Sequence, residues 1–356
     1  MKILRTMAAA SLLTALMAGT AVNAAENPID WRSVQHAKVD KQQVMRIGHS
    51  VNMEWSSHTA VLKRFAELVA VYSGNEIRAE LYPGSQLGGE VEMLQQARQG
   101  ALQVSLPAIN NLATLAPITN IFVLPYIATS TAEVNKLQDE LTPLINDTVV
   151  KQAGIRIVGW ENSGWRVFFY KGKKAFEKPE DLAALKLRVP PNAIMNATYK
   201  AWGGNATPLA WNELYSALEQ GVVDGGDSPI TDVIGMNFHE VINKVTPLHY
   251  TILSHPIVVS ERWFQGLSEK QQKAVLRAGQ EATDYIRWWQ PMDEQGWWDR
   301  AQKAGVEVLP LADETLWMET ARQVWPQFYD AIAPNGEGEA LVNKTQQILE
   351  DFRKSQ

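Results

Sequence analysis

The sequence contains no cysteine. A disulfide framework, a thiolate zinc site, an iron–sulfur cluster and a cysteine nucleophile are therefore all excluded. A chain of 356 residues is too long for one ordinary core and suits two domains. Its composition, 46% hydrophobic and 20% charged, is typical of a folded soluble protein. Stability must then come from apolar burial without covalent staples.

Positive charge is scarce, and no basic run occurs. The formal net charge is −6. Lys2 and Arg5 lie in an N-terminal segment that we predict to be removed (see below). Without them, 31 of the 33 basic residues remain against 39 acidic ones, and the net charge becomes −8. A mildly acidic protein without a basic patch argues against nucleic acid or anionic lipid as a partner.

Long hydrophobic runs are also missing. The nearest approach is Met7 to Ala18, far below the roughly 20 residues that span a bilayer. Lys2 and Arg5 precede this run, and Val22 and Ala24 provide small residues before a cleavage point. The pattern predicts a secretory signal peptide over residues 1–24, cleaved near Ala24, rather than a membrane anchor. We therefore expect a free periplasmic protein with no direct membrane insertion.

The usual catalytic and metal-binding motifs are absent. "HEVIN" at 239–243 begins like a zinc-protease motif but has Asn243 in place of the second histidine. No G-x-S-x-G elbow, Walker loop or GxGxxG loop occurs, and "DGGD" at 224–227 has the wrong spacing for an EF-hand. His249 and His255 would share one face of a strand, where a structural pair is favoured over a metal site. No metal and no cofactor are expected.

What the sequence does contain is an alternation of strand and helix patterns. Strands are predicted at 44–50, 76–83 and 101–108, with helices between them. The first helix, in "SSHTAVLKRFAELVAVYSG", has Ser56 or Ser57 to cap its start and Gly74 its end. Alternation at this spacing indicates parallel βαβ units and an α/β fold.

The same pattern restarts after about residue 150. "GIRIVGW" and "RVFFYK" read as strands, and 246–260 is a long extended run suited to crossing between domains. "SEKQ" (268–271) is a capping box that opens a long helical segment to about Gly305, kinked at Pro291. Two similar lobes without a linker indicate a chain that crosses between them more than once. We predict an arm (25–43), lobe I (44–163 and 254–292) and lobe II (164–253 and 293–356).

Two arginines on strands stand out. Arg166 ends "GWR" and Arg188 lies in "LKLRVPPN", where apolar and basic residues alternate and two prolines stop the strand. Taken singly, each is more simply a solvated surface charge. Together they can converge on one carboxylate, because the planar guanidinium binds a carboxylate through two hydrogen bonds. The stretch 207–229 adds Trp211 on a helix and a glycine-rich loop bearing Asp227 and Ser228.

Four stretches resemble the DctP family, the solute-binding proteins of tripartite ATP-independent periplasmic (TRAP) transporters. The resemblance runs from about residue 44 to about 330. A binding protein of an ABC importer would also have two lobes, but not this set of motifs. The matching stretches are "LYPGSQLGGEVEMLQQARQGALQVSLPA", "PEDLAALKLRVPPN", "TPLAWNELYSALEQGVVDGGDSP" and "LSEKQQKAVLRAGQEA".

The resemblance implies a two-lobed α/β periplasmic binding protein, of the type II-like Venus flytrap kind, with a long kinked helix spanning both lobes. It also implies roles for residues. Arg188 would bind the ligand carboxylate, Arg166 contacts the ligand in some relatives, and Trp211 would line the pocket. Ser228 stands where relatives often have asparagine. The loop after the first strand adds Asn52, Glu54 and Trp55.

Departures from the family pattern bear on the ligand. "GGDSP" replaces the commoner "GQENP", so carboxylate recognition leans less on this loop. Ala108 stands where a sialic-acid-binding relative has glutamate, which argues against sialic acid. Trp55, Trp211, Glu54 and Asp227 suit a compact hydroxylated acid such as a uronate, an aldonate or a hydroxylated dicarboxylate.

The expected partners are that acid and the small and large membrane subunits of a TRAP permease. Two other functions stay open at this point. One is the ligand-binding component of a signalling system, which would share the fold. The other is a periplasmic enzyme acting on an anionic sugar, with Glu54, Asp227 and His255 as acid–base groups.

Overall fold

The computed structural model describes residues 42–53, 56–290 and 294–356. The predicted signal peptide and nearly all of the predicted arm lie outside these ranges, as do Glu54, Trp55 and Pro291. Gln43, the last residue of the predicted arm, already belongs to the first strand.

Within the described ranges, nine strands form one mixed sheet in the order β2-β1-β3-β8-β4-β7-β5-β6, with β9 pairing to β8. They are β1 (Gln43–Gly48), β2 (Ile77–Tyr82), β3 (Val104–Ser105), β4 (Ile155–Tyr170), β5 (Lys186–Val189), β6 (Asn205–Pro208), β7 (Gly225–Pro229), β8 (Lys244–Ser260) and β9 (Glu307–Val308).

Helices cover this sheet. The α-helices are α2 (Ser57–Ser73), α3 (Glu90–Gln99), α4 (Ile109–Leu112), α5 (Thr131–Ala153), α6 (Ala193–Ala201), α7 (Leu214–Glu219), α8 (Ile230–Gly235), α9 (Glu261–Gln265), α10 (Glu269–Trp289), α11 (Glu294–Lys303), α12 (Thr315–Arg322), α13 (Tyr329–Ile332) and α14 (Glu337–Lys354). The 3-10 helices are η1 (Pro117–Phe122), η2 (Pro179–Ala184), η3 (Trp211–Glu213), η4 (Phe238–Glu240) and η6 (Trp325–Phe328).

The predicted α/β fold is confirmed, and the first helix has the predicted caps: Ser56 accepts from the Thr59 amide, and Gly74 adopts a left-handed conformation. Parallel pairing holds for β1 with β2 and β3, and for β5 with β6 and β7. The centre of the sheet differs from the predicted parallel arrangement, because β4 and β8 pair antiparallel. One strand leads out across the molecule and the other returns, so the two must run in opposite directions.

Two local predictions were wrong. The segments "GIRIVGW" and "RVFFYK" form one continuous strand, β4, so Arg166 lies well inside a strand and not at its start. The predicted glycine-rich loop with Asp227 and Ser228 is strand β7, paired with β4. Gly225 permits this pairing, because a Cβ there would lie 2.2 Å from the carbonyl oxygen of Phe169.

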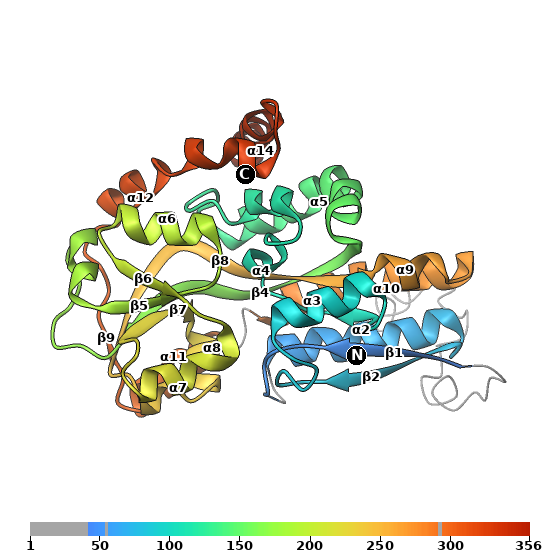
Figure 1. Cartoon of the computed structure of the whole chain (residues 1–356), viewed down its shortest axis with the longest axis horizontal. Helices are drawn as coiled ribbons and strands as arrows, with labels where there is room; N and C mark the ends of the chain where they lie inside the picture. Colours follow the sequence, from blue (N-terminus) through green and yellow to red (C-terminus); the bar gives the residue numbers. More distant parts are fainter. Residues whose placement is uncertain (1–41, 54–55, 291–293) are drawn as a thin grey trace, which may run out of the picture.

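β4 and β8 connect the two lobes (Figure 1). β1, β2, α2 and α10 lie around one half of these long strands, and β5, β6, β7, α7 and α8 around the other. β3 belongs with the first group because it pairs with β1. The β4–β8 register shifts between Ile157 and Gly159, between Asn162 and Gly164, and between Trp165 and Val167. Such bulges bend a strand and increase its twist, so they mark where the two halves are joined.

Each half has its own apolar core. One core packs α2 and α10 against β1 and β8, and a second packs α7, α8 and α11 against β4 and β8. A third cluster extends over both halves and includes α5, α6, α12 and α14. The lobe boundaries predicted from the sequence stay a prediction. Helix α14, which was assigned to lobe II, packs on α5 of predicted lobe I and forms an Arg353–Glu133 ion pair with it.

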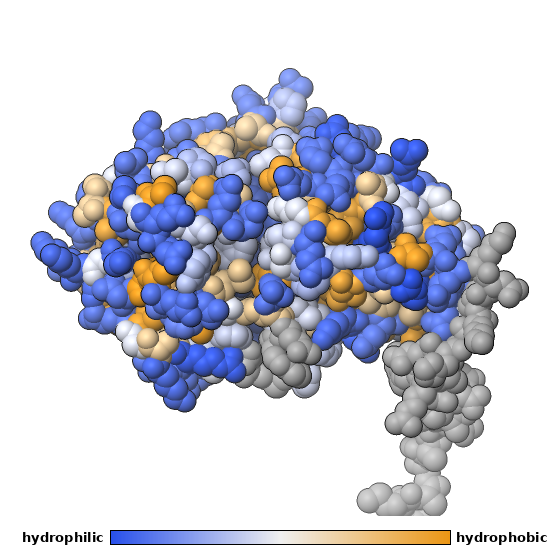
Figure 2. Space-filling view, turned by 60° about the horizontal axis from the view of Figure 1, so that its bottom comes forward, coloured by the Kyte–Doolittle hydropathy of each residue, from blue (hydrophilic) through white to orange (hydrophobic). Residues whose placement is uncertain are grey.

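The surface is mixed in character. Figure 2 shows one face on which small hydrophobic patches are separated by hydrophilic residues. Within the described ranges, no helix combines the length and the apolar character needed to cross a membrane.

Candidate ligand-binding site

A cavity lies between the two halves of the molecule, with about 340 Å³ of empty space that includes space open to solvent. The elements that bound it come from both halves, so a ligand in it would touch both. Its lining residues are Ser50, Val51, His58, Glu90, Ala108, Asn110, Asn111, Arg166, Arg188, Pro190, Trp211, Ser228, Asp232, Leu253 and His255.

Arg188 reaches this cavity because of its place on β5. Leu187 and Val189 point into the core and are fully buried. Arg188 points to the opposite face, yet it is only 2% exposed because the cavity walls enclose it. Its Nε donates to the Leu209 carbonyl oxygen at 2.9 Å, and its guanidinium carbon lies 5.7 Å from the ring centroid of Trp211. The side chain is therefore held in place without a carboxylate.

The charge of Arg188 lacks an acidic partner among the described residues, since none of their carboxylates forms an ion pair with it. Burial is the main reason that its pKa is lowered to about 10, with Asp227 opposing this effect and Arg166 reinforcing it. The group is still protonated at neutral pH. A buried cation of this kind favours an anion in the space that it faces.

Arg166 is held differently. Its Nη1 lies 3.1 Å from Oδ2 of Asp227, and its Nη2 donates to Oδ1 of Asn110 at 3.2 Å. Burial alone would lower the pKa of Arg166, but the Asp227 carboxylate raises it. Asp227 is fully buried, also accepts from the Tyr250 hydroxyl, and does not line the cavity. This aspartate neutralises Arg166 within the protein.

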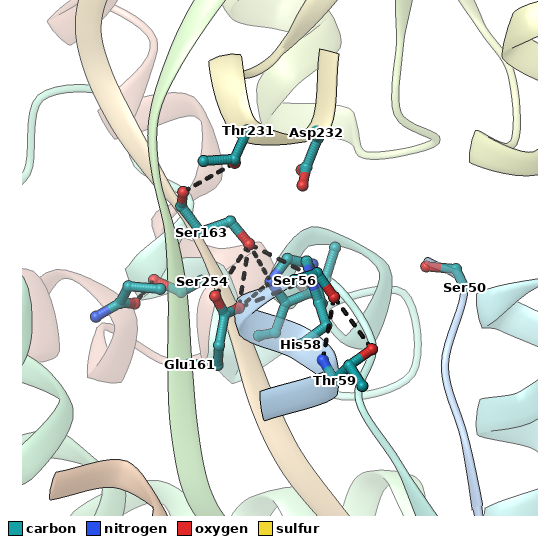
Figure 3. Close-up of polar contacts among 12 residues, drawn as sticks. Ser50, Ser56, His58, Thr59, Glu161, Ser163, Thr231, Asp232 and Ser254 are labelled. Carbon is teal, nitrogen blue, oxygen red and sulfur yellow. Dashed lines mark hydrogen bonds and ion pairs between the residues drawn. The ribbon is translucent and has the colours of Figure 1, made fainter. Parts of the chain in front are cut away.

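Hydroxyl and carboxyl groups form another part of the cavity wall. Ser228 donates through Oγ to Oδ2 of Asp232 at 3.1 Å. Burial, followed by the charge of Glu161, raises the pKa of Asp232 to about 7. Figure 3 shows Asp232 extending from α8 into the open space opposite Ser50.

Glu90, at the start of α3, is the most heavily hydrogen-bonded acid of the cavity wall. It accepts from Ser50 Oγ at 2.7 Å, from the Ala108 amide at 2.8 Å and from Asn111 Nδ2 at 2.7 Å. These bonds fix its carboxylate at the cavity surface. Glu90 was not among the site residues predicted from the sequence, although it lies in the "LGGE" part of a family-like stretch.

The structure brings together four of the residues proposed from the sequence: Arg188, Arg166, Trp211 and Ser228 line the cavity. Asp227 lies behind it, and Asn52 is packed beside Gly84 instead of lining it. Glu54 and Trp55 are outside the described residues. Ala108 does line the cavity, at the position discussed for sialic acid.

The polar residues missed by sequence reasoning include, besides Glu90, Asn110, Asn111, Asp232 and His58. None of them carried a pattern that singled it out, whereas His255 had been considered only as a structural histidine or as an acid–base group of an enzyme. His58 and His255 are 197 positions apart and meet only through the fold.

The predicted pairing of His249 with His255 was wrong. His249 is half-exposed and contacts Glu314, whereas His255 is buried against Glu161. The reason is the irregularity of β8 where Pro247 and Ile252 pair with Val167 and Trp165 of β4, which breaks the simple alternation of faces.

A larger cavity, with about 1030 Å³ of empty space, is bounded by α5, α10 and α11 as well as by β4. Its one guanidinium, that of Arg287, is already bound through two hydrogen bonds to Asp139. Asp232 borders both cavities. The smaller cavity, with an arginine that lacks a carboxylate partner, is the better site for an anion.

Comparison with known families gives one model that covers most of the chain. The model of the bacterial extracellular solute-binding protein family 7 (DctP) matches residues 47–331. This range contains every described residue of the smaller cavity.

Individual relatives agree with this match. A 2,3-diketo-L-gulonate-binding periplasmic protein of Escherichia coli is 28% identical, over 76% of this chain and 82% of its own length. An open, ligand-free TRAP periplasmic solute-binding protein from Rhodobacter sphaeroides is 33% identical, with a TM-score of 0.73 over 87% of this chain and 99% of that one. Another, from Roseobacter denitrificans with bound β-D-glucuronate, is 28% identical, with a TM-score of 0.80 over 85% and 99%.

Proposed function

Because the chain belongs to the bacterial extracellular solute-binding protein family 7 (DctP), we propose that it binds a hydroxylated carboxylate in the cavity around Arg188. Members of this family are solute-binding proteins of TRAP transporters and not enzymes. The fold is the two-lobed mixed α/β fold of these proteins.

The observation that carries the proposal is the contrast between Arg166 and Arg188. Asp227 compensates the charge of Arg166, whereas Arg188 presents a buried guanidinium to the cavity without an acidic partner among the described residues. A ligand carboxylate supplies the missing charge through two charge-assisted hydrogen bonds, each worth about 1.5–3 kcal/mol.

Hydroxyl groups on the ligand fit the opposite wall. Glu90, Asn111 and Asp232 offer hydrogen-bonding groups at the cavity surface, and Trp211 provides an apolar ring beside Arg188. The ligand named for the Roseobacter denitrificans relative, β-D-glucuronate, combines a carboxylate with several hydroxyls. A uronate, an aldonate or a hydroxylated dicarboxylate has this combination.

The protein works in transport by delivering its ligand unchanged to the membrane components of a TRAP transporter. We infer that it is exported to the periplasm with removal of residues 1–24. A ligand that touches both halves stabilises the closed form by binding it more tightly than the open form. The closed form is then the one that docks on the permease.

A thermal-shift screen tests the ligand class. Uronates, aldonates and hydroxylated dicarboxylates are compared with uncharged sugars and amino acids at equal concentration. We expect stabilisation by acids that carry hydroxyls and none by the uncharged sugars. Stabilisation by uncharged sugars or amino acids alone would reject the proposal.

Arg188→Ala tests the binding residue. With the best acid from the screen, we expect calorimetry to show affinity weaker by about tenfold to a hundredfold, because the bound carboxylate loses its buried partner. Arg78→Ala, on the exposed edge strand β2, is the matched control and should bind like the wild type. Unchanged affinity in Arg188→Ala would remove this residue from the site.

A further inference from the structure

Three side chains of types that can bind a metal lie together, two of them at the wall of the cavity and one behind it. His58 comes from α2, Glu161 from β4 and His255 from β8, and their exposed fractions are only 1%, 1% and 3%. One ligand atom from each lies within 4.8 Å of the others. Figure 3 shows Glu161 and Ser163 on β4 facing His58.

From this geometry we propose that the protein binds one divalent transition-metal ion, of the zinc class, through Nε2 of His58 and Nε2 of His255, with Glu161 supporting His255. The two Nε2 atoms are 3.2 Å apart. Two nitrogen ligands at about 2.0–2.1 Å from one tetrahedral ion are about 3.3–3.4 Å apart. The imidazoles therefore already have nearly the spacing that a shared ion requires.

The tautomer of His255 suits this role. Oε2 of Glu161 lies 2.9 Å from Nδ1 of His255 and accepts its proton. The lone pair of His255 is then on Nε2, which faces His58. A carboxylate that fixes a ligating histidine in this way is a recurrent part of protein metal sites.

The charge balance also favours a cation. Glu161 is a buried acid, only 1% exposed. Its described hydrogen-bonding partners, Ser57, Ser163 and His255, include no lysine or arginine. A divalent ion between the histidines would place positive charge beside this carboxylate and offset the cost of burying it.

The site is accessible from the cavity, because His58 and His255 are among its lining residues. Two histidines leave further coordination positions of a tetrahedral ion for water or another small ligand. Imidazole nitrogen ligands favour zinc, cobalt, nickel or copper over magnesium and calcium, which prefer sets made of oxygen alone.

The same residues do not form a Ser-His-Glu triad. Ser163 Oγ and Glu161 Oε2 both approach Nδ1 of His255, at 3.3 and 2.9 Å. In a triad the nucleophile and the acid contact opposite nitrogens of the ring.

Zinc titration by calorimetry, on the untagged mature protein stripped of metal, tests the proposal. No organic acid is present, so the result is independent of the proposed transport function. We expect one zinc ion per chain in the wild type and at least tenfold weaker binding in His58→Gln and His255→Gln. His249→Gln, which alters the exposed histidine–glutamate pair on the same strand, should bind zinc like the wild type.

Cobalt absorption spectroscopy on the wild type gives a second readout that needs no variant to fold. We expect visible bands of nitrogen-coordinated Co²⁺ that saturate at one equivalent and disappear on adding zinc. The proposal is overturned if the wild type binds neither ion saturably, or if His249→Gln loses the ion while the two buried variants keep it.

Discussion

Arg166 and Arg188 carry the same charge and face the same cavity, but they differ in their hydrogen-bonding and ionic partners. Asp227 holds Arg166 in a buried ion pair. Arg188 donates through Nε to a carbonyl oxygen, which orients the side chain without cancelling its charge. At the scale of single residues, the proposed specificity for an anion depends on this difference in partners.

Asp232 should make stability depend on pH. Its folded pKa, about 7, lies above the ordinary value of 3.8 because the residue is buried and near Glu161 and Glu90, an effect that Arg166 opposes. The folded state therefore binds a proton that the unfolded state releases. This contribution is complete below about pH 4 and is lost as the pH rises toward 7, about 4 kcal/mol in all.

We expect Asp232→Asn to remove that dependence. In chelator-containing buffer, urea unfolding should show the variant and the wild type equal in free energy near pH 4 and the variant more stable at pH 8. Ser228 can donate to the new amide oxygen as it does to Asp232. A constant difference between the two proteins across this pH range would contradict the assigned pKa.

At the scale of elements, α10 lies directly on β4. A Cβ added to Gly279 would lie 2.0 Å from the carbonyl oxygen of Val158, and one added to Gly159 would lie 2.6 Å from the oxygen of Gly279. Thr283 completes the contact by accepting from the Trp160 amide at 2.8 Å. Because Gly159 and Gly279 have no side chains, α10 can contact β4, the strand that joins the lobes.

Gly279→Ala tests this contact because two effects have opposite signs. Helix propensity alone predicts a gain of about 1 kcal/mol, whereas the backbone clash predicts a loss of about 1–3 kcal/mol. We expect chemical denaturation to show the loss. Gln280→Ala, at the exposed neighbour, should be nearly neutral; a stabilised Gly279→Ala would show that α10 can move away from β4 at little cost.

At the scale of the whole molecule, side chains bridge the two halves. Asn192 caps α6 by accepting from the Ile194 and Met195 amides. Its Nδ2 donates to the Asn110 carbonyl oxygen at 3.1 Å and to Oδ1 of Asn120 at 3.0 Å. One residue thus starts a helix in predicted lobe II and contacts predicted lobe I.

We expect Asn192→Ser to keep the helix cap and lose the bridge, because serine is also a good N-cap but has no amide donor. Without ligand, small-angle scattering should give a larger radius of gyration than for the wild type, and a saturating acid ligand should abolish the difference. Asn196→Ser, on the exposed side of the same helix, is the control. Superimposable curves for Asn192→Ser and the wild type would mean that the bridge does not hold the lobes together.

Local patterns predicted many of the elements because the signals are local. Helix α2 has the expected caps at Ser56 and Gly74, and the "SEKQ" capping box starts α10 at Ser268. Strand β5 follows the alternation of "LKLRV". The predictions were wrong where pairing between distant segments determines the structure. A Gly-rich segment forms strand β7 because β4 and β5 lie beside it.

The sequence by itself determined the fold class, the family and the two arginines, because strand periodicity, helix caps and family motifs all lie within short stretches of chain. Only the tertiary structure decided that Asp227 neutralises Arg166, that Arg188 has no described acidic partner, and that His58 meets His255. Charge compensation and metal geometry depend on distances of a few ångströms between residues far apart in the chain. Those distances exist only once β4 and β8 have brought the two halves together.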